Sequence, residues 1–189
     1  MENGGILYVF PVFHSAWMAK KIRYPAADDL FRVSLIFCLA LPLAVGGLAV
    51  LVSGGSDLYD QLIQPPLSPP GWVFPVMWTI LYLLMGYASY LVWTSGMEKA
   101  VVYPALGAYL VQLFFNFLWP VVFFGLVRFA AAFLVLVLLW IAIFITIRRF
   151  LPISPLAGKL LIPYLIWVSF AGYLNAGVWL LNQSNPFLS

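Results

Sequence analysis

The sequence predicts an all-α membrane protein, a bundle of about five transmembrane helices. Of its 189 residues, 65% are hydrophobic and only 8% are charged, whereas a soluble domain is roughly 45–50% apolar and about 25% charged. A soluble fold of this length could not hide so much apolar surface from water. The apolar residues form continuous runs and lack the alternation of a membrane β-barrel. Helices are therefore the expected way across the bilayer.

The elements follow from the order of the apolar runs and of the residues that interrupt them. Residues 1–30 carry both basic and acidic side chains and are expected to be an N-terminal extension, followed by the transmembrane domain at residues 31–189. Pro42, midway in the first run, predicts a kink. Residues 53–71 are rich in glycine and proline, so they are expected to form a non-helical loop that covers one end of the bundle. The expected helices are residues 33–52, 72–93, 101–125, 129–147 and 160–181.

Lysine and arginine are distributed unequally between the two ends of this expected bundle. Only Arg128 falls on the side opposite the N-terminus. Because basic residues concentrate on the cytoplasmic side of a membrane, a bacterial cell membrane would have the N-terminus inside and the C-terminus outside. The basic residues on the N-terminal side are Lys20, Lys21, Arg23, Arg32, Lys99, Arg148, Arg149 and Lys159.

The expected spans contain no Asp, Glu, Lys, Arg or His. Ion-coupled pumps need such residues in the membrane, and acid–base or triad catalysis needs them at the active site, so neither class is expected. The single histidine, His14, and the single cysteine, Cys38, predict neither a metal site nor an intrachain disulfide. The net charge of +3 comes from bases scattered near helix ends, which argues against nucleic-acid binding.

What remains for chemistry is aromatic and weakly polar. Gln112 and Asn116 are four residues apart and share a helix face, and Trp119 lies three residues further on. Spacing alone favours helix packing, with Asn and Gln as interhelical hydrogen-bonding groups. The alternative is an apolar cavity with a few polar anchors for a small ligand. Similar rows are Trp78, Tyr82 and Gly86 in the second span, and Trp167, Ala171 and Leu174, with Asn175 at the edge, in the fifth.

Three segments carry a resemblance to a known family. Residues 65–82 read PPLSPPGWVFPVMWTILY, residues 116–120 read NFLWP and residues 163–171 read PYLIWVSFA. They resemble the first loop with the second helix, the third helix and the fifth helix of the TspO/translocator protein family, the peripheral-type benzodiazepine receptors. The resemblance runs in order from about Leu39 to Asn182, and residues 1–30 have no counterpart in it.

The resemblance implies a five-helix bundle, usually a homodimer, whose pocket under the first loop accepts porphyrins, sterols in animal members, and synthetic drugs. It implies a membrane-embedded sensor, carrier or scavenger of porphyrin or haem that requires no cofactor. Light- and oxygen-dependent degradation of porphyrin is an alternative, and transport of porphyrins or other apolar molecules is a further one. Together with the rows of residues that share a helix face, the resemblance gives these candidate ligand-binding residues: Phe74, Trp78, Tyr82, Asn116, Trp119, Phe123, Trp167, Ala171, Leu174 and Asn175.

Individual positions refine these expectations. Trp78 and Trp167 match the tryptophans that some bacterial relatives use in light-dependent porphyrin breakdown, so they are the candidate photochemical residues. Ala176 and Leu180 stand where the animal cholesterol motif has a tyrosine and a basic residue, which argues against specific cholesterol binding. In the third helix Gly107 is followed by Val111, so the pair of small residues often found at the family's dimer contact is incomplete.

Overall fold

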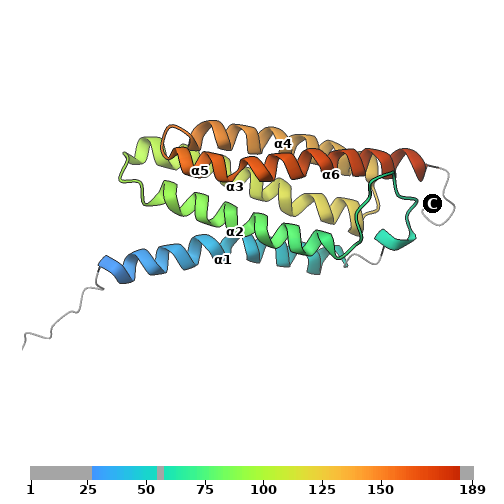
Figure 1. Ribbon diagram of the computed structural model, residues 1–189, viewed down its shortest axis with the longest axis horizontal. Helices are drawn as coiled ribbons and strands as arrows, with labels where there is room; N and C mark the ends of the chain where they lie inside the picture. Colours follow the sequence, from blue (N-terminus) through green and yellow to red (C-terminus); the bar gives the residue numbers. More distant parts are fainter. Residues whose placement is uncertain (1–26, 55–57, 184–189) are drawn as a thin grey trace, which may run out of the picture.

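The computed structural model describes residues 27–54 and 58–183, so most of the expected N-terminal extension lies outside the described residues. The described part is helical and contains no strand. The helices are α1 (Ala27–Ser53), α2 (Val73–Trp93), α3 (Lys99–Pro120), α4 (Phe129–Phe150), the short α5 (Pro155–Leu160) and α6 (Ile162–Leu181). Figure 1 shows the long helices side by side along one axis, with the turn before α3 and the turn before α5 at one end of the bundle and the loop before α2 at the other.

Five segments of the described chain are long and apolar enough to cross a membrane, and α5 and α6 together form the fifth. Large apolar side chains are exposed on every one of them, which lipid accommodates and water does not. The expected all-α, five-span fold class is therefore confirmed, and the protein is an integral multi-pass membrane protein. One such exposed side chain from each span, in chain order, is Ile36, Leu83, Phe114, Leu134 and Ile166.

The fourth and fifth spans extend beyond the ranges that hydropathy suggested. Helix α4 continues to Phe150 and takes Arg148 and Arg149 into its last turn, where basic side chains interact favourably with the helix dipole. The fifth span begins at Pro155 instead of residue 160, and the Ser154 hydroxyl accepts a hydrogen bond from the Ala157 N–H at 3.3 Å, which caps α5. Hydropathy missed these turns because they carry basic residues and prolines.

Two prolines interrupt helices that the sequence suggested would be continuous. Pro163 has no N–H to bond the carbonyl four residues earlier, and the chain leaves the α-helix at Leu161, between α5 and α6. Pro120 ends α3, and a π-helical turn, η2 (Val121–Gly125), follows it. In contrast, α1 includes Pro42 in its interior and stays helical on both sides of it.

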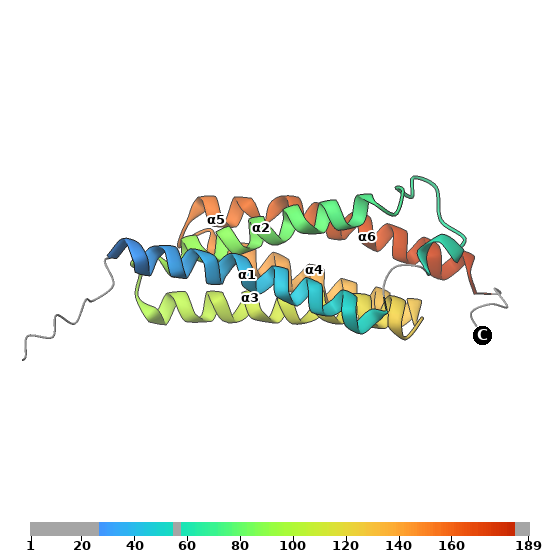
Figure 2. The ribbon, with the colours of Figure 1, turned by 90° about the horizontal axis from the view of Figure 1, so that it is seen from below.

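Most of the described basic residues lie at the end of the bundle opposite the loop, the basic end. Helices α1 and α2 are in contact near the basic end and separate toward the loop end. A Cβ on the buried Gly86 would lie 2.6 Å from the Cys38 carbonyl oxygen and 2.7 Å from Leu39 Cα, so only glycine permits this approach. At the other end α1 finishes against η2, where a Cβ on Gly125 would lie 3.4 Å from Ser53 Cα. Figure 2 shows the result, with α1 ending near the end of α3 while α2 begins near the loop.

The loop between α1 and α2 is fastened to α6. The Asn182 side chain binds both backbone groups of Ile63, accepting from its N–H at 3.0 Å and donating to its carbonyl at 2.8 Å. The Tyr173 hydroxyl donates to the Pro66 carbonyl at 2.8 Å. A Cβ on Gly177 would lie 2.5 Å from Pro65 Cβ, so the proline ring packs directly on the α6 backbone. These contacts hold the loop over one end of the bundle.

Candidate ligand-binding site

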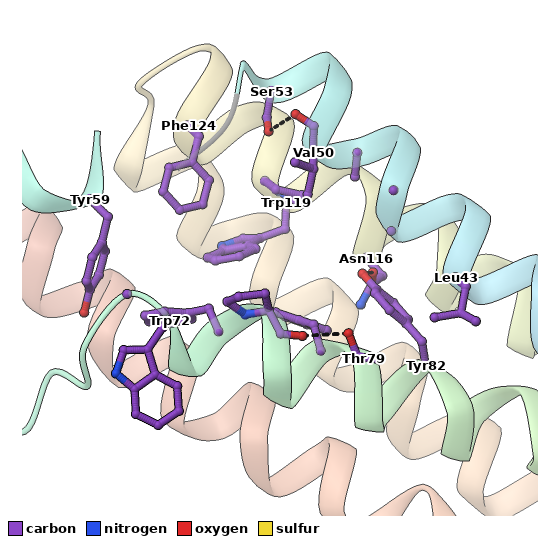
Figure 3. Close-up of a pocket in the computed structure, with 18 residues that line it drawn as sticks. Leu43, Val50, Ser53, Tyr59, Trp72, Thr79, Tyr82, Asn116, Trp119 and Phe124 are labelled. Atoms are coloured by element: carbon purple, nitrogen blue, oxygen red, sulfur yellow. Dashed lines mark hydrogen bonds between the residues drawn. The ribbon is translucent and has the colours of Figure 1, made fainter. Parts of the chain in front are cut away.

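A cavity of about 640 Å³ lies between α1, α2 and α3, under the loop. Its volume falls within the roughly 300–1,000 Å³ of small-molecule sites. Figure 3 shows the side chains of Trp119, Asn116 and Tyr82 in the space between α1 and α2. The lining residues are Leu43, Gly46, Gly47, Ala49, Val50, Ser53, Tyr59, Gly71, Trp72, Phe74, Pro75, Trp78, Thr79, Tyr82, Asn116, Trp119, Pro120 and Phe124.

The structure divides the ten candidate ligand-binding residues into two groups. Those on α2 and α3 line the cavity, namely Phe74, Trp78, Tyr82, Asn116 and Trp119. The others are not among the lining residues and lie on η2 and α6; three of them, Phe123, Trp167 and Asn175, contact residues of the wall. This second group is Phe123, Trp167, Ala171, Leu174 and Asn175.

Asn116 connects the wall of the cavity to two other helices. Its side-chain oxygen accepts a hydrogen bond from the Tyr82 hydroxyl at 2.9 Å, and its Nδ2 donates to the Tyr164 hydroxyl at 2.8 Å. Asn116 is 2% exposed and Tyr164 is fully buried. Asn116 therefore combines the packing role and the cavity role that were alternatives in the sequence. It links α2 to α6 by hydrogen bonds, and it lines the cavity.

Trp119 is held in place by residues of the second group. Its indole N–H donates to Asn175 Oδ1 at 3.0 Å, and Asn175 Nδ2 donates in turn to the Phe129 carbonyl at 2.9 Å. The Phe123 ring lies 5.3 Å from the Trp119 ring, centroid to centroid. Asn175 and Phe123 thus act on the cavity through Trp119, whose orientation they fix.

Trp78 is the centre of an aromatic cluster drawn from three helices. Its ring stacks on Tyr82 with centroids 5.6 Å apart and planes 28° apart. The Trp119 ring lies 6.5 Å away, and Tyr164 meets Trp78 edge-on at 6.1 Å. Such a cluster offers flat π faces beside a cavity, the arrangement on which a planar aromatic ligand can stack.

Trp167 lies behind the cavity wall, whereas Trp78 is part of it. Its ring meets Phe74 at 6.1 Å and Phe170 at 5.7 Å, and Phe74 separates it from the cavity. Its Nε1 is buried and has no hydrogen-bond partner among the described residues. Of the two candidate photochemical tryptophans, a ligand in the cavity would therefore touch Trp78 directly and Trp167 only through Phe74.

The sequence analysis expected the loop to cover the pocket but named no lining residue from the loop or from α1. Gly46 and Gly47 sit side by side in α1, and both line the cavity together with Val50 and with Tyr59 of the loop. The pair of glycines within an apolar span is the one local signal for this wall, because it leaves space where large side chains would fill it.

The chemistry of the wall limits what the cavity can do. None of the described residues that line it is charged, and no group of His, Cys, Asp and Glu in the described chain could hold a metal ion. The hydroxyls of Ser53 and Thr79 already donate to the carbonyls of Val50 and Pro75 within their own helices. The site is suited to binding an apolar molecule through ring faces and a few polar atoms.

Comparison with known proteins places nearly the whole described chain in one family. The sequence model of the TspO/MBR family matches residues 35–180. Protein CrtK of Rhodobacter capsulatus is 40% identical over 153 residues, which cover 81% of this chain and 92% of the relative. The tryptophan-rich protein TspO of Chlorobaculum tepidum is 40% identical over 152 residues, 79% of this chain and 96% of the relative. The translocator protein of Homo sapiens is 42% identical over 127 residues, 66% and 75% of the two chains.

Proposed function

Because this chain belongs to the TspO/MBR family, we propose that it binds a tetrapyrrole, porphyrin or haem, in the cavity under the loop and acts as a sensor, carrier or scavenger of that ligand. Membership supports the general role of a membrane sensor or translocator. The geometry of the cavity wall supports the narrower proposal that the ligand is a tetrapyrrole.

The observation that carries the proposal is the aromatic cluster beside an uncharged cavity. The rings of Trp78 and Trp119 offer faces to a flat macrocycle, and stacked aromatic pairs contribute roughly 0.5–1.5 kcal/mol beyond area burial. Asn116 lies on the same wall and supplies a polar side chain for the ring nitrogens. Propionate groups, which are unfavourable in the membrane interior, would stay near the loop and the water.

Light-dependent breakdown of the bound porphyrin is the second candidate function, and the position of Trp78 favours it. An indole on the cavity wall can give one electron to a light-excited porphyrin, with oxygen as the final oxidant. This chemistry needs no acid–base residue, and none lies on the described wall. Phenylalanine is much harder to oxidise than tryptophan, which makes the two functions separable by substitution.

The test is a titration of the purified protein with protoporphyrin, haem and a sterol, in the dark and then under illumination. Tetrapyrrole binding with no sterol binding is expected. For photochemistry, Trp78→Phe and Trp167→Phe should each keep porphyrin binding, measured by fluorescence quenching, and lose the light-dependent decay of its absorption. Trp93→Phe is the control, because Trp93 is exposed at the far end of α2. Equal decay in all variants would exclude Trp78 and Trp167, and absence of binding by the wild type would overturn the proposed function.

The orientation in the membrane is also a proposal. Lys99, Arg148, Arg149 and Lys159 lie at the helix ends beside the turns at one end of the bundle, and Arg128 lies at the end where the loop is. We assign the basic end to the cytoplasm of a bacterial cell, following the bias of basic residues in membrane proteins. A homodimer is proposed as well, as the resemblance to the family implies.

A further inference from the structure

The exposed residues of the cavity wall within the spans lie on two helices only. On α1 these are Gly47 and Val50, and on α2 they are Pro75 and Thr79. Val50 is 57% exposed, whereas Asn116 on the α3 wall is 2% exposed. All four exposed residues fall inside segments long and apolar enough to span the bilayer. Outside the spans, Gly71 and Trp72 are the other exposed lining residues, so the exposed part of the wall runs from the loop end along α1 and α2 into the depth of the spans.

The separation of α1 and α2 produces a lateral mouth, which is bounded by Gly47, Val50, Pro75 and Thr79. Toward the basic end the two helices are in contact at Gly86. One helical turn nearer to the loop, the Tyr82 ring packs on Gly46. Next to this contact, Gly47 faces open space, since a Cβ there would have no atom of a neighbouring element within 4 Å. The axes of α1 and α2 diverge toward the loop, as Figure 2 shows.

The alternative way in, past the loop on the α6 side, is closed by specific contacts. Asn182 holds both backbone groups of Ile63, and Tyr173 holds the Pro66 carbonyl. Asn182 is 5% exposed, so its two hydrogen bonds to Ile63 are partly buried, whereas the Tyr173 hydrogen bond lies at an exposed position. Opening this side would break three hydrogen bonds and the packing of Pro65 on Gly177 together, whereas the lateral mouth has no described contact to break.

We infer that ligands enter and leave the cavity laterally, from the bilayer through the mouth between α1 and α2, and that the loop is a fixed cap. This inference rests on the proposed function and names the class of ligand that it suits. The ligand would be a planar amphipathic molecule that first dissolves in the membrane and enters with its apolar edge leading. Its acidic groups would remain at the level of Trp72, which is 69% exposed at the start of α2, the usual depth of interfacial tryptophans.

A reversible plug in the mouth tests the route. Val50→Cys is made in a Cys38→Ala background, reconstituted in phosphatidylcholine vesicles and modified with benzyl methanethiosulfonate, which dithiothreitol removes. Protoporphyrin association is followed by stopped-flow tryptophan quenching. We expect the modification to slow association and dissociation together by about tenfold or more, and dithiothreitol to restore both rates, because entering and leaving molecules pass the same barrier. The control is Val111→Cys on the exposed face of α3, outside the wall.

Two further variants keep the test decisive. Gly47→Phe fills the same mouth without a thiol, and Gly107→Phe on α3 is its control, because both glycines have open space around a Cβ. Asn182→Ala releases the loop, and lateral entry predicts an unchanged association rate. Faster association in Asn182→Ala, or an unslowed rate behind the plug, would overturn the lateral route while leaving binding intact. A wild type that binds no protoporphyrin would overturn the proposed function itself.

Discussion

Asn116→Leu is the substitution whose effect follows most directly from the structure. Leucine has a similar volume but can neither accept from the Tyr82 hydroxyl nor donate to the Tyr164 hydroxyl, so two interhelical hydrogen bonds of 2.9 and 2.8 Å are lost. The Tyr82 hydroxyl lies on the cavity wall and can find another partner there. The Tyr164 hydroxyl is fully buried and is left without one.

The expected loss of stability has two parts. Side-chain hydrogen bonds between helices in a membrane contribute on average about 0.6 kcal/mol each, so the two bonds account for about 1.2 kcal/mol. Leaving the buried hydroxyl of Tyr164 unpaired adds about 1–3 kcal/mol. The free energy of unfolding should therefore fall by about 2–4 kcal/mol, and porphyrin affinity should fall as well, because Asn116 lines the cavity.

A double-mutant cycle with Tyr164→Phe isolates the second part. Removing the hydroxyl from the Asn116→Leu protein removes the unpaired group, so the double variant should be no less stable than Asn116→Leu alone. Unfolding in mixed micelles, followed by circular dichroism, gives the four free energies. Tyr103→Phe, on an exposed position of α3, is the control that should show no coupling to Asn116. Additive effects of Asn116→Leu and Tyr164→Phe would refute this account of the network.

Two other outcomes can be checked in the same preparations. Gly86→Ala places a Cβ 2.6 Å from a backbone oxygen of α1 and should lower the free energy of unfolding by about 1–3 kcal/mol; Gly107→Ala, with open space around the Cβ, should be neutral or stabilising by about 0.5–1 kcal/mol. After Cys38→Ala, single cysteines at Gln61 and Lys99 should react with an impermeant thiol reagent from opposite faces of the membrane, because the two positions lie at opposite ends of the bundle. Reaction of both from the same face would contradict the arrangement of the spans.

The fold class could be predicted from the sequence because the bilayer leaves few alternatives. An apolar run of spanning length must pair its own backbone groups, so it is a helix, and the second helix lies at Val73–Trp93 against the expected residues 72–93. The fifth span is also helical, but it begins five residues before the expected residue 160. Its beginning depends on Pro155, Lys159 and Pro163, whose hydrogen-bonding and capping effects an average hydropathy does not register.

Helical spacing also predicted which residues share a face, and so indicated Trp78 with Tyr82 and Asn116 with Trp119. Each pair lies on one helix, where geometry is local and fixed by the 3.6-residue turn. Spacing did not show whether those faces meet a cavity or another helix. The answer for Asn116 depended on Tyr164, a residue of α6 far along the chain.

The helices that line the cavity were decided only by the tertiary structure. In the sequence, α1 is an apolar run with no face distinguished, and the residues of α6 seemed as good candidates for the wall as those of α2. Helix α1 contacts α2 at Gly86 and η2 at Ser53, which leaves space between α1 and α2. The Phe74 ring contacts Trp167 and takes its place in the cavity wall. These contacts join segments distant in the sequence, and their outcome depends on the shapes of both partners at once, which no single stretch of residues specifies.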